Sequence, residues 1–219
     1  MAGSRHGPDT ALIPTGLLGG SFNPAHGAHR SISLFALRRL ALDEIWWLVS
    51  PGNPLKPAAG MAPLRTRMRS ARAAARRAPI RVTAIERELG TRYTIDTLRK
   101  LVRRYPDRRF IWLMGADNLQ QFHRWKQWRD IARLLPIAVI ARPGYDDAAQ
   151  SAVAMGWLRR FVHRAGQAEH WTKWGPPALV IIASRPDPTS ATAIRARNPC
   201  WHQHSSTAAV RDGLTRRLV

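Results

Sequence analysis

Short runs of consecutive apolar residues recur along this chain, and most are followed by a segment whose apolar residues have helical spacing. Six such runs are found, at Thr15–Leu18, Glu44–Val49, Ile80–Ile85, Phe110–Met114, Ile137–Ala141 and Ala178–Ala183. Strands that are apolar without alternation are typically buried on both faces, as in a parallel sheet covered by helices. The sequence therefore predicts a doubly wound, Rossmann-like α/β fold, with a parallel sheet of about six strands and helices on both faces.

The segments between these runs predict the helices. Helical spacing indicates helices from about His26 to Leu42, from Pro63 onward, at Thr94–Arg104, after Met114 to about Leu134, and at Ala148–Val162. A short helix is expected to begin at Ser190 and to run to Arg197, and a terminal helix is expected at Thr207–Leu218.

The domain organisation follows from length and local composition. Residues 1–14 contain Gly, Ser, Pro and charged side chains, and they lack the apolar core of a signal peptide. We interpret them as a flexible leader. A chain of 219 residues suits one full core, so residues 15–219 are expected to form a single domain. Residues 184–219 are expected to be a small helical subregion of that domain.

The chain is strongly basic, with 35 Lys and Arg residues against 14 Asp and Glu residues and a net charge of +21. Such a field attracts polyanions, and an RNA-binding module would use it. Only four of the basic residues are Lys, however, and the basic residues are spread through the chain rather than gathered in one run. This distribution favours phosphorylated small molecules over nucleic acid as partners.

Other compositional features exclude several classes of protein. No apolar run approaches the length of a membrane span. Cys200 is the only cysteine, which excludes a disulfide framework, and the segment Cys200–His204 has no second group of ligands with metal-site spacing. The sequence therefore predicts a cytoplasmic protein with no membrane partner and no protein-held metal site, and it leaves a homo-oligomer open.

The segment Gly19–His29 is the first candidate site. A glycine pair follows an apolar strand, and His26 and His29 lie three residues apart at the start of a helix, on one side of it. Glycines let backbone N–H groups approach phosphate oxygens, and a helix N-terminus attracts anions. The pattern predicts a polyphosphate site in which both histidines stabilise charge on a leaving phosphate oxygen.

Two further segments carry candidate residues for a nucleotide. Ser190 and Thr192 lie at the start of a short helix, and Arg195 follows on its first turns, where a guanidinium can contact phosphate oxygens. Gly115 and Asp117 follow a strand directly, and a carboxylate at a strand's end suits a ribose hydroxyl.

These segments together resemble a known superfamily. His26-Gly27-Ala28-His29 resembles the (T/H)xxH signature of the nucleotidyltransferases, and Ser190–Arg195 resembles their (S/T)xTxxR signature. Three other segments are similar to one branch, the bacterial nicotinate-nucleotide adenylyltransferases; they are Tyr93–Leu98, Phe110–Asp117 and Arg142–Tyr145. The resemblance covers about Thr15 to Arg197. It implies that the chain joins ATP and nicotinate mononucleotide to give nicotinate adenine dinucleotide and pyrophosphate, in NAD biosynthesis.

The resemblance also implies a role for each candidate residue. The catalytic residues would be His26, His29 and Arg195. The ATP-binding residues would be Gly19, Gly20, Ser21, Phe22, Gly115, Asp117, Ser190 and Thr192. The residues that bind nicotinate mononucleotide would be Lys56, Thr94, Trp125, Lys126 and Arg142. Mg²⁺ would enter with ATP. Another nucleotidyltransferase of the superfamily, acting on nicotinamide mononucleotide or phosphopantetheine, is the alternative, and an RNA-binding module is the third hypothesis.

Overall fold

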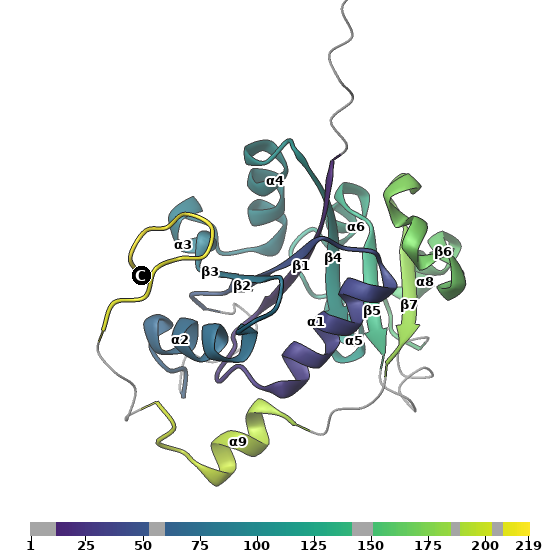
Figure 1. Cartoon of the computed structure of the whole chain (residues 1–219). Helices are drawn as coiled ribbons and strands as arrows, with labels where there is room; N and C mark the ends of the chain where they lie inside the picture. The colour runs from purple at the N-terminus through teal and green to yellow at the C-terminus, as the bar shows by residue number, and fades with distance from the viewer. Residues whose placement is uncertain (1–11, 53–59, 142–150, 185–188, 203–207) are drawn as a thin grey trace, which may run out of the picture.

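A computed structural model describes residues 12–52, 60–141, 151–184, 189–202 and 208–219. Its centre is one seven-stranded sheet in the order β3-β2-β1-β4-β5-β7-β6, in which every neighbouring pair is parallel (Figure 1). The strands are β1 (Ile13–Gly20), β2 (Glu44–Val49), β3 (Ile80–Thr83), β4 (Arg108–Gly115), β5 (Ile137–Ala141), β6 (Val162–His163) and β7 (Leu179–Ala183). The predicted α/β fold is confirmed, with seven strands instead of about six.

Alternate residues of the strands feed two apolar cores, one on each face of the sheet. In β1, Leu18 packs into one core and Leu17 into the other, and both are buried. In β2, Trp47 and Trp46 divide in the same way, and all six residues of that strand are buried. Burial on both faces explains why the strand sequences are continuous apolar runs.

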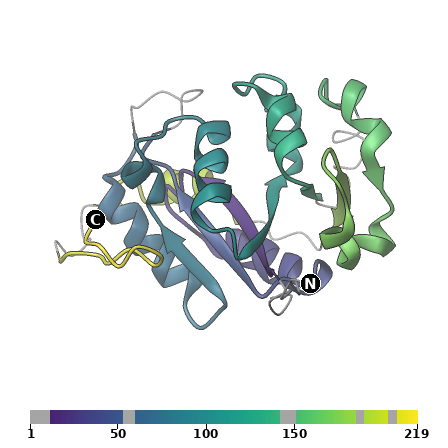
Figure 2. The ribbon, with the colours of Figure 1, turned by 90° about the horizontal axis from the view of Figure 1, so that it is seen from above.

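Helices cover both faces of the sheet (Figure 2). One core receives side chains from α1 (Gly27–Arg39), α2 (Leu64–Ala75) and the 3₁₀ segment η2 (Ala165–Lys173). The other receives side chains from α3 (Ile85–Leu89), α4 (Thr94–Arg104), α5 (Ala116–Phe122), α6 (Trp128–Leu134) and α8 (Met155–Leu158). Two short elements complete the description, η1 (Arg159–Phe161) and α9 (Ala191–Arg197). Within the described part of the chain, no helix is long and apolar enough to cross a membrane.

Several predicted boundaries are wrong. The predicted strand Ile80–Ile85 ends at Thr83, and α3 begins two residues later. The helical region after β4 breaks between α5 and α6, where Gln127 has a φ of 49°. The seventh strand, β6, begins at Val162, the last residue of the segment expected to be helical, and residues 148–150 of that segment lie outside the described residues.

The terminal helix predicted at Thr207–Leu218 is also wrong. The described segment 208–219 is non-helical and lies against the edge strand β3, where the Gly213 N–H donates to the Val82 carbonyl oxygen at 2.9 Å. A Cβ atom on Gly213 would lie 2.6 Å from that oxygen, so only glycine allows the close approach. The contact covers an edge that would otherwise offer unpaired backbone groups.

Asp212 fixes this segment to the sheet. Its carboxylate is buried, and it accepts hydrogen bonds from the Thr83 hydroxyl, from the Ala84 N–H at 2.7 Å and from the Leu214 and Thr215 N–H groups. The donors lie on both sides of the interface, so one side chain joins the 208–219 segment to the connection between β3 and α3.

We predict that Asp212→Ala lowers the free energy of unfolding by about 3 kcal/mol, because buried donors on both sides lose a charged acceptor. Asp212→Asn keeps one acceptor oxygen and should lower the free energy of unfolding by less. Chemical unfolding followed by circular dichroism measures both. Asp107→Asn is the matched control, since the Asp107 side chain is 61% exposed and its change should stay within about 0.5 kcal/mol. Equal stability of Asp212→Ala and this control would show that Asp212 does not fix the 208–219 segment to the sheet.

Candidate functional site

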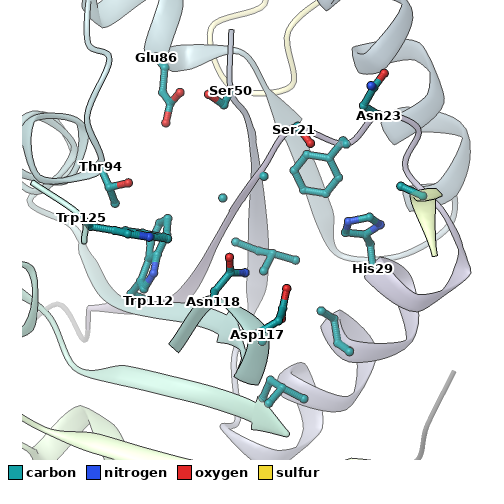
Figure 3. A pocket seen from close by; sticks show the side chains of 18 of the residues that line it. Ser21, Asn23, His29, Ser50, Glu86, Thr94, Trp112, Asp117, Asn118 and Trp125 are labelled. Atoms are coloured by element: carbon teal, nitrogen blue, oxygen red, sulfur yellow. The ribbon is translucent and has the colours of Figure 1, made fainter. Parts of the chain in front are cut away.

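A cleft of about 490 Å³ opens at the carboxyl ends of β1, β2 and β4 (Figure 3). Gly20 ends β1, Ser50 follows β2 and Gly115 ends β4, and all three line the cleft. The strand order reverses direction between β1 and β4, and open parallel sheets bind ligands at such a switch point. The fold therefore places the cleft where a doubly wound sheet binds its ligands.

His26 and His29 form one wall of the cleft. His26 is the N-cap residue of α1, His29 lies in its first turn, and their ring centroids are 4.0 Å apart. The His26 backbone N–H donates to Nδ1 of His29 at 3.3 Å, so a neutral His29 ring carries its proton on Nε2. Two imidazoles and the positive end of the α1 dipole thus meet at one place, as the sequence predicts, and they suit phosphate oxygens.

Gly19 and Gly20 are the last residues of β1, instead of following the strand as the sequence suggests, and the turn comes after them. A Cβ atom on Gly19 would lie 2.6 Å from the Trp112 ring, which is 3% exposed. Glycine is therefore required here for packing between β1 and β4. Its lack of a side chain also keeps the backbone open to the cleft.

Phe22 holds the turn after β1 in an unusual conformation. Its φ is 46°, in the left-handed region that costs energy for any residue but glycine. The Phe22 ring stacks on Trp47 at 5.0 Å and contacts the His29 ring at 4.8 Å. The strain is thus retained at a position where an aromatic ring supports the His29 imidazole from behind.

Arg67, on α2, fixes the loops at the strand ends. Its guanidinium is buried and donates to the carbonyl oxygens of Ser21 and Ser50 at 2.7 Å, of Ala62 at 2.8 Å and of Pro51 at 3.2 Å. Burial lowers the pKa of Arg67 from its ordinary value. One side chain therefore sets the distance between the loops that follow β1 and β2.

The second motif lies beside the first. Ser190 is the N-cap of α9, its hydroxyl accepts from the Ala193 N–H, and it lines the cleft as predicted. Arg195 donates to the Asn23 carbonyl oxygen at 2.6 Å, which fastens α9 to the loop before α1. Thr192 is exposed and accepts from Arg195 at 3.4 Å. Ser190 is among the residues that line the cleft, and Thr192 and Arg195 are not.

Thr94 and Trp125 lie on the opposite side of the cleft from His29 (Figure 3), and Lys126 lines the same cleft. Thr94 is the first residue of α4, whose first N–H groups have no acceptor within the helix. The Lys126 ammonium lies 3.1 Å from the Asp96 carboxylate and 4.5 Å from the centroid of the Tyr93 ring. A second helix N-terminus, a cation and an indole ring face the cleft here, which is an arrangement that suits an aromatic carboxylate.

Gly115 and Asp117 also line the cleft, at the end of β4 and the start of α5. The predicted residues Gly19, Gly20, Ser21, Phe22, His26, His29, Thr94, Gly115, Asp117, Trp125, Lys126 and Ser190 therefore share one cleft. Lys56 and Arg142 lie outside the described residues.

Glu86 lines the same cleft, and sequence reasoning missed it. It lies in the first turn of α3, is 9% exposed, and hydrogen-bonds with the Ser50 side chain. Burial raises the pKa of Glu86 to about 7, against a smaller lowering by Ser50. The available signal was its position just after an apolar run, because residues that follow parallel strands lie at the ligand-binding edge.

Comparison with known proteins agrees with this geometry. A family model described as Cytidylyltransferase-like matches residues 17–197. A protein of Erythrobacter litoralis named "Probable nicotinate-nucleotide adenylyltransferase" is 61% identical over 212 residues, which are 96% of each chain. One of the same name from a Bradyrhizobium species is 47% identical and covers 85% of this chain and 97% of its own. A solved Plasmodium falciparum nicotinic acid mononucleotide adenylyltransferase, complexed with NaAD, has a TM-score of 0.62 at 15% identity, covers 84% of this chain and 83% of its own, and shares the fold.

We predict that Glu86→Gln stabilises the protein at pH 8 and not near pH 4. The folded carboxyl stays neutral up to pH about 7, whereas the unfolded one ionises above its ordinary pKa of 4.5, so stability is lost as the pH rises between these values. At pH 8 the free energy of unfolding of Glu86→Gln should exceed that of the wild type by on the order of 3 kcal/mol. Urea unfolding at both pH values measures it.

Glu88→Gln is the control, because Glu88 lies on the same helix but forms an ion pair with Arg104 at 2.8 Å. It should give no gain at pH 8. A Glu86→Gln variant whose stability relative to the wild type does not change with pH would show that the carboxyl is not held in its neutral form.

Proposed function

We propose that this chain, which belongs to the cytidylyltransferase-like family and, within it, to the nicotinate-nucleotide adenylyltransferases, transfers the adenylyl group of ATP to nicotinate mononucleotide. The products are nicotinate adenine dinucleotide and pyrophosphate, and the reaction is a step of NAD biosynthesis. The partners of the protein are thus two phosphorylated small molecules, to which a chain of net charge +21 is electrostatically suited.

The observation that carries the proposal is a single cleft with a helix N-terminus on each of two opposite walls. His26 and His29 accompany the N-terminus of α1, and Thr94 and Trp125 accompany that of α4. The first wall suits phosphate groups, and the second suits an aromatic ring that carries a carboxylate. A substrate pair that brings a triphosphate to one wall and a pyridine carboxylate to the other fits both.

The chemistry requires little more than positioning. The phosphate of the mononucleotide attacks the α-phosphorus of ATP, a new phosphorus–oxygen bond forms, and the bond to the pyrophosphate oxygen breaks. The nucleophile is already an anion, so the protein needs neither a covalent nucleophile nor a strong base. His26 and His29 stabilise the charge that develops on the phosphate oxygens, and the cleft holds the two substrates in line.

We propose further roles for the residues around them. Gly19, Gly20, Ser21, Phe22 and Ser190 surround the triphosphate, and Asp117 with Gly115 contacts the adenosine part of ATP. Thr94, Trp125 and Lys126 hold the nicotinate ring and its carboxylate. Arg195 acts from outside the cleft lining, where it fastens α9 to the Asn23 carbonyl oxygen. Thr192, which hydrogen-bonds to Arg195, orients its guanidinium.

We propose that Mg²⁺ enters with ATP and is held by its phosphate oxygens and by water, and that it neutralises phosphate charge. The carboxylates that line the cleft are Glu86 and Asp117. Among the described residues, no three His, Cys, Asp or Glu side chains are grouped so that they could hold a metal ion. Mg²⁺ accepts this environment, because it commonly keeps several waters and binds through substrate phosphates.

The purified protein with ATP and Mg²⁺ should form a dinucleotide from nicotinate mononucleotide with a kcat/KM at least about tenfold above that for nicotinamide mononucleotide, because one charged hydrogen bond is lost with the amide. Chromatography of the products measures this, and phosphopantetheine serves as the third substrate. No product from either mononucleotide would refute the proposal. Equal use of the two would remove the role given to the α4 wall.

His29→Ala should lower kcat by about 10²–10³-fold, because a donor to the developing charge is lost. The measurement is steady-state turnover at saturating ATP and mononucleotide. His170→Ala is the matched control, since His170 is 58% exposed and lies outside the cleft lining. It should retain wild-type turnover. A His29→Ala enzyme that turns over like this control would remove His29 from the reaction.

A further inference from the structure

The proposed transfer step does not involve Glu86, which lines the same cleft. We propose that Glu86 is a substrate-binding residue whose carboxylate accepts a hydrogen bond from a ribose hydroxyl of the mononucleotide. This inference rests on the proposed function, because it concerns how the same cleft holds its second substrate.

The position of Glu86 indicates that it contacts the mononucleotide and not ATP. Figure 3 shows Glu86 on the same side of the pocket as Thr94 and Trp125, across from His29. All four residues line one cleft. A mononucleotide whose ring lies at Trp125 and whose phosphate points toward His29 carries its ribose between the two, within the cleft that Glu86 lines.

The chemistry of Glu86 indicates that, within the mononucleotide, it contacts the ribose. The nicotinate carboxylate and the phosphate are both anions that accept hydrogen bonds, and above pH about 7, where Glu86 is ionised, its carboxylate repels them. The ribose hydroxyls are the groups that donate. Cationic side chains for the two anionic ends are present in the same cleft, namely Arg92, Arg124 and Lys126.

The surroundings of Glu86 leave it able to accept. Its hydrogen-bond partner Ser50 also contacts the Gly52 carbonyl oxygen, at 2.5 Å, and a hydroxyl has a single proton to donate. The carbonyl therefore competes with Glu86 for that proton. Within the described residues Glu86 forms no ion pair with Lys or Arg, in contrast to Glu88, which pairs with Arg104. A carboxyl this buried, with a shared hydroxyl as its partner, has acceptor positions for a ligand.

The connection between β3 and α3 explains how Glu86 is held there. Thr83 and Ala84 donate to the buried Asp212 carboxylate, and the Ile85 N–H donates to the Thr83 hydroxyl at 3.1 Å. Glu86 follows directly, in the first turn of α3. Its backbone is thus anchored through the 208–219 segment, so the side chain is positioned before any substrate binds.

The test pairs a change in the protein with a change in the substrate. Isothermal calorimetry measures binding of nicotinate mononucleotide and of its 2′-deoxy and 3′-deoxy forms to the wild type, to Glu86→Ala and to Glu86→Gln. One deoxy form should bind the wild type about 10- to 100-fold more weakly. Glu86→Ala should weaken binding of the complete substrate by a similar factor and should bind that deoxy form with no further loss. Glu86→Gln, which keeps an acceptor oxygen, should lie between.

Affinity for ATP should stay unchanged in every variant, and Glu88→Gln should behave as the wild type toward all three mononucleotides. Thermal unfolding at the assay pH checks that each variant is folded. The inference is overturned if the losses from Glu86→Ala and from the deoxy substrate multiply, because independent effects mean that the two groups do not touch. If the two losses multiply and the wild type still forms dinucleotide, only the ribose contact is refuted. A wild type that forms none refutes the proposed function as well.

Discussion

The cleft depends on one buried cation. The Arg67 guanidinium lies beneath the loops that follow β1 and β2, and it donates to the backbone carbonyl oxygens of Ser21, Ser50, Pro51 and Ala62. Carbonyl groups at strand ends have left the ladder and must find donors when they are buried. A planar group with several N–H donors satisfies four at once, and it costs only the burial of one charge that lowers its pKa. The guanidinium thus joins the loop that carries Ser21 to the loop that carries Ser50 and Pro51.

The same solution recurs on the other sides of the cleft. Asn23 is buried and connects its own loop to Gly60 and Ala62 through its side-chain amide, while its carbonyl oxygen receives Arg195. Asp212 plays the corresponding part for the start of α3. In each case a single buried polar side chain holds irregular backbone at the ligand-binding edge of the sheet. The strands supply a rigid base, and these side chains convert it into fixed loop positions.

The sequence predicts those features that depend on neighbours in the chain. The strands Glu44–Val49 and Ile137–Ala141 and the helix Thr94–Arg104 have the predicted bounds, because continuous burial or an amphipathic face marks their whole length. Prediction from the sequence fails where a partner that is distant in the sequence determines the local structure. The 208–219 segment has apolar residues at helical spacing, yet Asp212 and Gly213 pair with β3 far away in the sequence. The role of Arg67 is likewise invisible in the sequence, because its partners are backbone groups that carry no sequence signal.

Transfer without a covalent nucleophile makes geometry the main contribution of the protein, and this explains why the structure retains costly features at the cleft. Phe22 keeps a left-handed φ of 46°, and Glu86 keeps a carboxyl whose pKa burial raises to about 7. Either cost would be relieved by an ordinary substitution, so stability alone does not account for them. Phe22 supports the His29 ring, and Glu86 lines the cleft on the same side as Thr94 and Trp125. In the proposed reaction both are places where a substrate is held, which is the pattern expected when stability is exchanged for alignment.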